Sequence, residues 1–274
     1  MASMKGKVVV LVGCASGMGA ATLKMLLAAG ATVIGFDNNR ENMADTLDEI
    51  NEELPEFKDN LNVVYGDVTS AEDRSRLVTT VREKYGRIDS LLYVAGVLDL
   101  MCPAHKTDDL LWQYVMDVNC NDCFYLVRDC LSMLLDHEGP AANVVIVGSV
   151  GGLYGSTAGA AYVTSKHAVL GLARNLAWSY HWRNLKVNVV NPGAIISGIL
   201  GNAMEKWPDR DVMDPEGNDL YNVRGGVSLG CDAAGNNMMG TSEDIARAIL
   251  FLIDDDNAYI NGAQLTVDGG WTSF

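Results

Sequence analysis

The sequence has little of several features that would mark particular classes of protein. It has 20 lysines and arginines against 35 aspartates and glutamates, and the resulting net charge of −15 disfavours binding to phosphate backbones and anionic membranes. No stretch reaches the ~18 uninterrupted apolar residues of a membrane span. The first ten residues, MASMKGKVVV, lack the apolar core and cleavage site of a signal peptide. We therefore expect a cytoplasmic protein that binds neither nucleic acid nor membranes.

Cysteine and histidine are also scarce. Six cysteines in 274 residues are too few for a secreted disulfide framework, so we expect free thiols. Cys120 and Cys123 form a C-x-x-C pair, but no second pair or histidine cluster lies nearby to complete four zinc ligands. Buried helix cysteines are the simpler interpretation. The four histidines show no metal-ligand spacing, and we expect no metal site.

Apolar segments of strand length alternate with longer segments of helical period along the whole chain. This alternation is typical of a parallel sheet covered by helices on both faces. No linker, repeat or low-complexity tract divides the chain, so we expect one domain over residues 1–274. The predicted fold class is α/β, a single-domain Rossmann-type doubly wound sheet of about seven strands, with helices between the first six. The strands are predicted near Val8–Val12, Thr32–Phe36, Asn62–Tyr65, Ser90–Val94, Asn143–Val147, Lys186–Val190 and Gln264–Val267.

Residues 197–240 depart from this alternation. The segment is rich in Met, Gly, Asp and Asn, and it is far longer than the ~2–6 residues usual for a connection in α/β units. Long insertions often form binding loops, so we expect substrate selection here. A disordered excursion is the alternative.

The first predicted strand runs into a glycine-rich turn, Gly13-Cys-Ala-Ser-Gly17-Met-Gly19, and a predicted helix follows. Glycine tolerates positive φ and lets a pyrophosphate approach the backbone, while the helix N-terminus supplies N–H donors. After a strand at the start of an α/β chain, such a turn predicts a dinucleotide site rather than an ordinary loop. The expected contacts are Gly13, Ser16, Gly17, Met18 and Gly19.

Asp37 ends the second predicted strand, where its carboxylate can accept hydrogen bonds from the adenosine ribose hydroxyls of NAD. The same carboxylate would repel the extra phosphate of NADP. The glycine turn carries no lysine or arginine to bind that phosphate, although Arg40 could bend toward it. Asp67 and Val68, after the third strand, suit a contact with adenine. The sequence therefore predicts NAD rather than NADP.

Tyr162 and Lys166 stand four residues apart, which places the phenol and the ammonium on one face of a helix. A tyrosine hydroxyl titrates near ~10 in isolation, and an adjacent positive charge favours its phenolate, as a general acid or base requires. Alone, the pair could be an ordinary surface contact. Ser149, however, follows the fifth strand at the carboxyl edge of the sheet, where open α/β folds bind ligands. Together the three residues predict a catalytic site.

In order and spacing, the motifs of nearly the whole chain resemble the short-chain dehydrogenase/reductase family. They are Gly13–Gly19, Asp67, Tyr93-Val-Ala-Gly96, Val118-Asn119, Ser149, Tyr162-x-x-x-Lys166, Asn191-Pro-Gly193 and Asp268-Gly-Gly270. Two positions depart from the family pattern. Val94 replaces the asparagine of the Asn-Ala-Gly turn, and we expect repacking rather than inactivity. Gly148 stands where many members carry serine.

The resemblance implies a role for each catalytic residue. Tyr162 would be the proton donor or acceptor, and Ser149 would orient and polarise the substrate carbonyl. Lys166 would bind the nicotinamide ribose and lower the pKa of Tyr162, and Asn119 would hold a relay water. The cofactor would supply the hydride. The resemblance also implies a homotetramer (or dimer), and it adds Ala95, Gly96, Pro192, Gly193, Ile195 and Ser197 to the expected cofactor contacts.

The side chains expected to face the substrate are large and apolar. They favour a bulky lipophilic alcohol or ketone over a sugar or an acyl-carrier substrate. Residues 152–156 also resemble those of bacterial bile-acid and steroid dehydrogenases, so our hypothesis is a hydroxysteroid dehydrogenase. The alternatives are a dehydrogenase for another alcohol, a 3-oxoacyl reductase, and an inactive NAD-binding sensor. The expected substrate residues are Leu98, Leu153, Tyr154, Met204 and Trp207, with Met213, Met238 and Met239.

Overall fold

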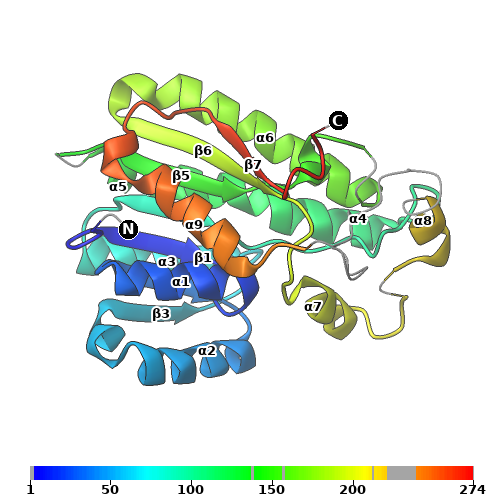
Figure 1. The fold of residues 1–274 in the computed structure, drawn as a ribbon, viewed down its shortest axis with the longest axis horizontal. Coiled ribbons are helices and arrows are strands. Elements are labelled where there is room, and N and C mark those ends of the chain that lie inside the picture. Colours follow the sequence, from blue (N-terminus) through cyan, green and yellow to red (C-terminus); the bar gives the residue numbers. More distant parts are fainter. Residues whose placement is uncertain (1–2, 137–138, 156–157, 212, 221–238, 274) are drawn as a thin grey trace.

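One parallel sheet of seven strands organises the chain (Figure 1). The computed structural model describes residues 3–136, 139–155, 158–211, 213–220 and 239–273. In this part of the chain the strand order is β3-β2-β1-β4-β5-β6-β7. The predicted doubly wound fold is therefore confirmed. The strands are β1 (Val8–Val12), β2 (Thr32–Asp37), β3 (Leu61–Tyr65), β4 (Ser90–Tyr93), β5 (Ala142–Val147), β6 (Leu185–Pro192) and β7 (Gln264–Val267).

The central strands are apolar along their whole length because helices cover both faces of the sheet. In β1, Val8, Val10 and Val12 belong to one buried cluster, whereas Val9 and Leu11 belong to the other. The first cluster also contains residues of α3, α5 and α6, and the second contains residues of α1, α2 and α9. Helices α1 and α9 lie in front of the sheet in Figure 1.

The predicted helices between the first six strands are all present. They are α1 (Gly17–Ala28), α2 (Arg40–Glu53), α3 (Ala71–Lys84), α4 (Asp109–Met116), α5 (Asp122–Leu135) and α6 (Ala160–Tyr180). Single turns add η1 (Pro55–Asn60), η3 (Val150–Gly152), η4 (His181–Arg183) and η6 (Asp255–Asn257). The π-helical turn η2 (Asp117–Asn121) joins α4 to α5 without a break.

Three helices after β6 are additions to the sequence prediction. The segment 197–240 contains α7 (Ile199–Lys206) and α8 (Pro215–Asp219), which lie beyond the end of the sheet to which the strand arrows point (Figure 1). Helix α9 (Ser242–Ile253) begins with a capping box formed by Thr241 and Asp244. That motif, followed by the apolar spacing of Ile245, Ile249 and Ile253, could have identified α9 from the sequence.

The described cysteines are free, as expected, and Cys123 of the C-x-x-C pair is buried in α5. Among the described side chains, no group of three or more could hold a metal ion. No helix in this part of the chain is both long enough and apolar enough to cross a membrane.

Candidate active site

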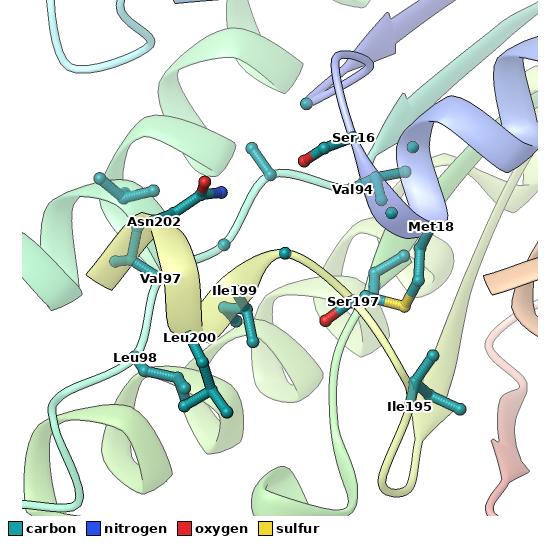
Figure 2. Close-up of a pocket in the computed structure, with 18 of the residues that line it drawn as sticks. Ser16, Met18, Val94, Val97, Leu98, Ile195, Ser197, Ile199, Leu200 and Asn202 are labelled. Carbon is teal, nitrogen blue, oxygen red and sulfur yellow. The ribbon is translucent and has the colours of Figure 1, made fainter. Parts of the chain in front are cut away.

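A pocket of ≈ 1090 Å³ opens at the carboxyl ends of the central strands. This position follows from the topology, because the chain turns to opposite sides of the sheet after β1 and β4 and leaves a crevice between the two turns. The glycine turn forms one part of the lining and α7 another. In Figure 2, Ser16 and Met18 lie toward the glycine turn, whereas Leu98 and Leu200 lie together in the lower part of the view.

The glycine turn is shaped by contacts that only glycine permits. Gly13 has φ +81°, and a Cβ there would lie 2.6 Å from the backbone N of Ala95. A Cβ on Gly19 would collide with the carbonyl oxygen of Gly13. Helix α1 has no acidic residue in its own first turn, so no carboxylate of the helix opposes an anion at its N-terminus. The turn is therefore a cradle for an anionic group.

Asp37 connects the end of β2 to the glycine turn. Its carboxylate accepts hydrogen bonds from the backbone N–H of Ala15 and of Asn39, both at 2.9 Å. Burial raises the pKa of this carboxyl above its ordinary value, and the backbone donors oppose that effect. The Arg40 guanidinium lies 4.2 Å from the ring centroid of Tyr65, so this cation is stacked on an aromatic face.

The other residues predicted to hold the cofactor also line the pocket. Asp67 accepts hydrogen bonds from the backbone and hydroxyl of Thr69, both at 2.8 Å, and Val68 is buried beside it. The pocket lining includes Ala95, Gly96, Pro192, Gly193, Ile195 and Ser197. The structure thus brings all the predicted cofactor contacts to one cavity.

Ser149 begins the short turn η3 after β5. Its Oγ accepts a hydrogen bond from the backbone N–H of Gly151 at 3.0 Å, and its own N–H donates to Oδ1 of Asn191 at 3.2 Å. A Cβ on Gly148 would collide with that same Oδ1. The departure from the family pattern at Gly148 therefore follows from the position of Asn191.

Tyr162 and Lys166 lie in the first turns of α6 and both line the pocket. The Lys166 Nζ lies 5.5 Å from the ring centroid of Tyr162 and donates a hydrogen bond to the carbonyl of Val147 at 3.0 Å. Burial lowers the pKa of Lys166 to about 8. No described carboxylate forms an ion pair with this ammonium, so its charge acts on the phenol without a competing anion.

Asn119 lies behind the pocket wall rather than in the lining. It belongs to η2, and its amide accepts from the N–H of Val97 at 2.9 Å and donates to the carbonyl of Val97 at 3.0 Å. It also donates to Ser165 Oγ at 3.0 Å. Asn119 therefore joins the loop after β4 to helix α6. Val94, which replaces the asparagine of the family turn, is buried in the apolar cluster under α1.

Three of the predicted substrate residues, Leu98, Met213 and Met239, line the pocket. Four others are absent from the described lining. Leu153 packs against the core, and the hydroxyl of Tyr154 donates to the carbonyl of Thr272 at 3.3 Å. Met204 is 59% exposed. Trp207 packs edge-to-face on Tyr114, with 5.9 Å between the ring centroids. Met238 lies outside the described residues.

The sequence interpretation also missed several pocket residues. The most prominent group is on α7, where Ile199, Asn202 and Lys206 recur at helical spacing and leave Met204 on the opposite side. The position of α7 could not be deduced without its helix boundaries. The missed residues include Met101, Tyr114, Val150, Ile199, Leu200, Asn202, Glu205, Lys206 and Trp271.

The chain is similar to known proteins along nearly its whole length. A family model described as short chain dehydrogenase matches residues 7–207, and one described as enoyl-(acyl carrier protein) reductase matches residues 231–272. The chain is 31% identical to 3beta-hydroxysteroid dehydrogenase 2 of Eggerthella lenta, over 99% of this chain and 96% of that protein. It is 30% identical to short chain dehydrogenase adrF of Penicillium roqueforti, over 99% of each chain. The crystal structure of levodione reductase, 25% identical, matches with a TM-score of 0.81 over 98% of this chain and 99% of that one.

Proposed function

The chain belongs to the short-chain dehydrogenase/reductase family, and from that premise we propose that it is an NAD-dependent enzyme that interconverts a hydroxysteroid or bile acid and the corresponding ketone. One observation carries the proposal. Ser149, Tyr162 and Lys166 line the same cavity as the glycine turn and a set of apolar side chains. This arrangement offers a proton-transfer group, a cofactor cradle and a lipophilic wall together.

The proposed reaction uses each polar group in a way that its hydrogen bonds permit. In the oxidation direction, Tyr162 would take the proton of the substrate hydroxyl. A nicotinamide cofactor held by the glycine turn would supply the acceptor for the hydride that leaves the carbon bearing that hydroxyl. The Ser149 oxygen already accepts from Gly151, so its O–H can donate to the substrate oxygen. The two hydroxyls then hold the reacting oxygen from different sides.

Lys166 supports the phenolate by its charge. At neutral pH its ammonium remains mostly protonated, since its pKa is about 8, and only one of its hydrogen bonds is directed to Val147. The other N–H groups can bind a ribose hydroxyl. The relay water proposed at Asn119 would be bound by the main-chain carbonyl, because the side-chain amide is occupied by Val97 and Ser165.

NAD fits the cradle better than NADP. Gly13 and Gly19 leave the space that a Cβ would fill, as a pyrophosphate requires. Asp37 presents a carboxylate where the phosphate of NADP would lie. Arg40, the cation nearest to it in the chain, is stacked on Tyr65 and also lines the pocket. The carboxylate of Asp37 is the observation that supports the choice of NAD.

The apolar lining supports a steroid-like substrate. Leu98, Met101 and Leu200 line the pocket with Met213 and Met239, and flexible methionines suit a broad hydrocarbon surface. A relative with 31% identity is described as a 3beta-hydroxysteroid dehydrogenase. We place substrate selection in α7 and the loop after β4.

Self-assembly is also part of the proposal. Exposed apolar side chains occur on α4 and α5 (Leu110, Trp112 and Phe124) and at the end of α6 (Trp178 and Trp182). Such surfaces favour burial against a second copy. Light scattering after size exclusion tests this point: a tetramer or dimer is expected, and a monomer of 29.5 kDa would contradict it.

The proposed function is tested by the initial rate of NADH formation. The panel contains steroids and bile acids that differ in the free ring hydroxyl, together with small alcohols and sugars, and NADP runs in parallel. Selective turnover of one steroid hydroxyl with NAD is expected. Turnover of a smaller alcohol alone would exclude the steroid substrate, and binding of NAD without any turnover would favour the sensor.

A further inference from the structure

A buried carboxylate outside the catalytic set lies against the helix that carries Tyr162. Asp99 follows β4 and is fully buried, and no described cation forms an ion pair with it. Its Oδ1 accepts from the N–H of Gly159 at 3.1 Å, and its Oδ2 accepts from the N–H of Tyr162 at 2.8 Å. The carboxylate therefore bonds directly to the backbone of the proposed catalytic tyrosine.

These two bonds replace the usual cap of a helix. The N-cap residue of α6 is Gly159, which has no side chain, and Tyr162 is the third residue of the helix. In most helices a polar side chain at the N-cap accepts from that third N–H. Here Asp99 supplies the cap from 60 residues earlier in the chain. The N–H of Ala160, the first residue of the helix, donates to the carbonyl of Cys102 at 3.3 Å.

The contact is tightly constrained on both sides. A Cβ on Gly159 would lie 2.5 Å from Oδ2 of Asp99 and would collide with the carbonyl oxygen of Cys102. On the loop side, Leu100 and Met101 adopt left-handed backbone conformations, with φ of +60° and +57°. Such conformations are costly for residues other than glycine and persist only where surrounding contacts enforce them.

The same loop forms part of the substrate end of the pocket. Leu98 and Met101, on either side of Asp99, line the cavity. The carbonyl of Leu100 accepts from the N–H of Asp214, at the start of α8, at 2.9 Å. Asp99 thus lies where the catalytic helix, the pocket wall and the segment after α7 meet.

We propose that Asp99 is a positioning residue, which holds the first turn of α6 and the loop 97–102 in one fixed arrangement and so sets Tyr162 relative to the bound substrate. The inference rests on the proposed role of Tyr162 in proton transfer. Asp99 itself touches neither cofactor nor substrate in this mechanism. Its effect should therefore appear in the chemical step and not in cofactor binding.

The test compares Asp99→Asn with Asp244→Asn. Asparagine keeps the size of Asp99 but offers one oxygen, so an NH₂ group would face one of the two N–H donors. Asp244 is the control for loss of a capping carboxylate, because it accepts from the N–H and hydroxyl of Thr241 at the start of α9, which contributes no residue to the lining of the active-site pocket. We expect kcat per folded Asp99→Asn molecule to fall tenfold or more, which is on the order of the loss caused by misplacing a catalytic group. The dissociation constant for NAD should stay within about twofold of the wild-type value, because the substitution disturbs the chemical step and not the cofactor site. The control should keep both values.

An unchanged kcat per folded Asp99→Asn molecule would overturn the proposal, as would an equal loss of kcat and NAD affinity. If the variant does not fold, hydrogen exchange of the wild type decides: the amides of Gly159 and Tyr162 should be protected, and free exchange of both would overturn the proposal. If Tyr162→Phe is as active as the wild type, the proposed function and this inference both fail. If Tyr162→Phe loses activity but Asp99→Asn is as active as the wild type, this inference alone fails.

Discussion

The cofactor end and the substrate end of the pocket are built in different ways. At the cofactor end, short segments leave the ends of β1, β2 and β3, and backbone contacts at Gly13 and Gly19 decide their shape. At the substrate end, side chains of α7 and of the loop after β4 line the pocket, and the start of α8 is joined to that loop by a backbone hydrogen bond from Asp214 to Leu100. A dinucleotide would require particular residue types at the first end, whereas many combinations of apolar side chains could line the second.

The forces that hold the two ends differ as well. Exposed ion pairs, Lys106 with Asp214 at 3.1 Å and Arg210 with Asp108 at 2.7 Å, tie the substrate segment to the loop after β4. Such exposed pairs contribute little to stability. The glycine turn instead lies against the buried core of the sheet. We therefore expect substitutions to have larger effects at the catalytic centre and cofactor end than at the substrate end.

The largest effect is predicted for Tyr162→Phe at the junction of the two ends. Loss of the proton-transfer hydroxyl should lower kcat on the order of 10²–10⁴-fold. NAD binding should be nearly unchanged, because the glycine turn and Asp37 keep their contacts. Stopped-flow turnover and a titration of NAD measure the two quantities. Turnover at the wild-type rate would refute the proposed mechanism.

Gly19→Ala tests how far the backbone determines the cofactor end. The added Cβ would collide with the carbonyl of Gly13, so the turn must open. We expect NAD affinity to fall on the order of 100-fold, which is about 2.7 kcal/mol. Gly201→Ala is the control, since a Cβ there would meet nothing within 4 Å. Equal NAD affinity in the two variants would show that the turn is not the cradle.

Lys166→Met tests the buried ammonium through the pH dependence of stability. The folded-state pKa of Lys166, about 8, lies below its ordinary value of 10.5, so the folded protein releases this proton while the unfolded chain keeps it. The free energy of unfolding contributed by Lys166 should therefore rise between pH 8 and 10.5, by about 3 kcal/mol in total. Below pH 8 the residue is protonated in both states and its burial remains a cost.

Denaturant unfolding of the wild type and Lys166→Met at several pH values in this range measures the difference. Titrating groups that do not interact with Lys166 are common to both proteins and cancel, whereas the thiols of Cys120 and Cys123, whose charges couple to Lys166, contribute to the difference. A difference in unfolding free energy that stays constant from pH 8 to 10.5 would show that Lys166 keeps an ordinary pKa.

Asp37→Ser tests the selectivity between NAD and NADP. Removal of the carboxylate removes the expected repulsion of the NADP phosphate and the bonds to ribose, so the ratio of kcat/KM for NAD over NADP should fall by about tenfold or more. Arg40→Ala should change the ratio little, because the carboxylate of Asp37 rather than the guanidinium of Arg40 is expected to set the preference. A strong loss of NADP use in Arg40→Ala would instead assign the phosphate to Arg40.

The same contrast explains which residues the sequence could predict. Gly13, Asp37 and Tyr162 stand beside predicted strands or within a predicted helix, so the fold places them at the sheet edge. The residue types at the substrate end were foreseen, but Met204 and Trp207 were not placed correctly relative to the pocket. Their direction depends on the rotation of α7, which is set by tertiary packing. Asp99 was missed because its partners lie 60 and 63 residues away.

The smallest effect is predicted for two apolar side chains four residues apart on α7. Leu200 lines the pocket and Met204 does not, although both are partly exposed. Leu200→Ala removes apolar carbon that a lipophilic substrate would cover. We expect a loss of about half the transfer free energy of a leucine side chain, ~1 kcal/mol, which corresponds to a roughly fivefold higher KM. Met204→Ala should change KM less than about twofold, as expected for an exposed side chain without contacts to the ligand.

The pair is well matched, because alanine favours helix at both positions and α7 should remain formed. A larger KM for both variants would mean that the substrate extends over the outer face of α7. A larger KM for Met204→Ala alone would mean that α7 turns about its axis when the substrate binds. The orientation of α7 in this structure would then differ from its orientation in the substrate complex. Only the predicted asymmetry is consistent with a substrate that contacts Leu200 inside the pocket and does not extend one helical turn further to Met204.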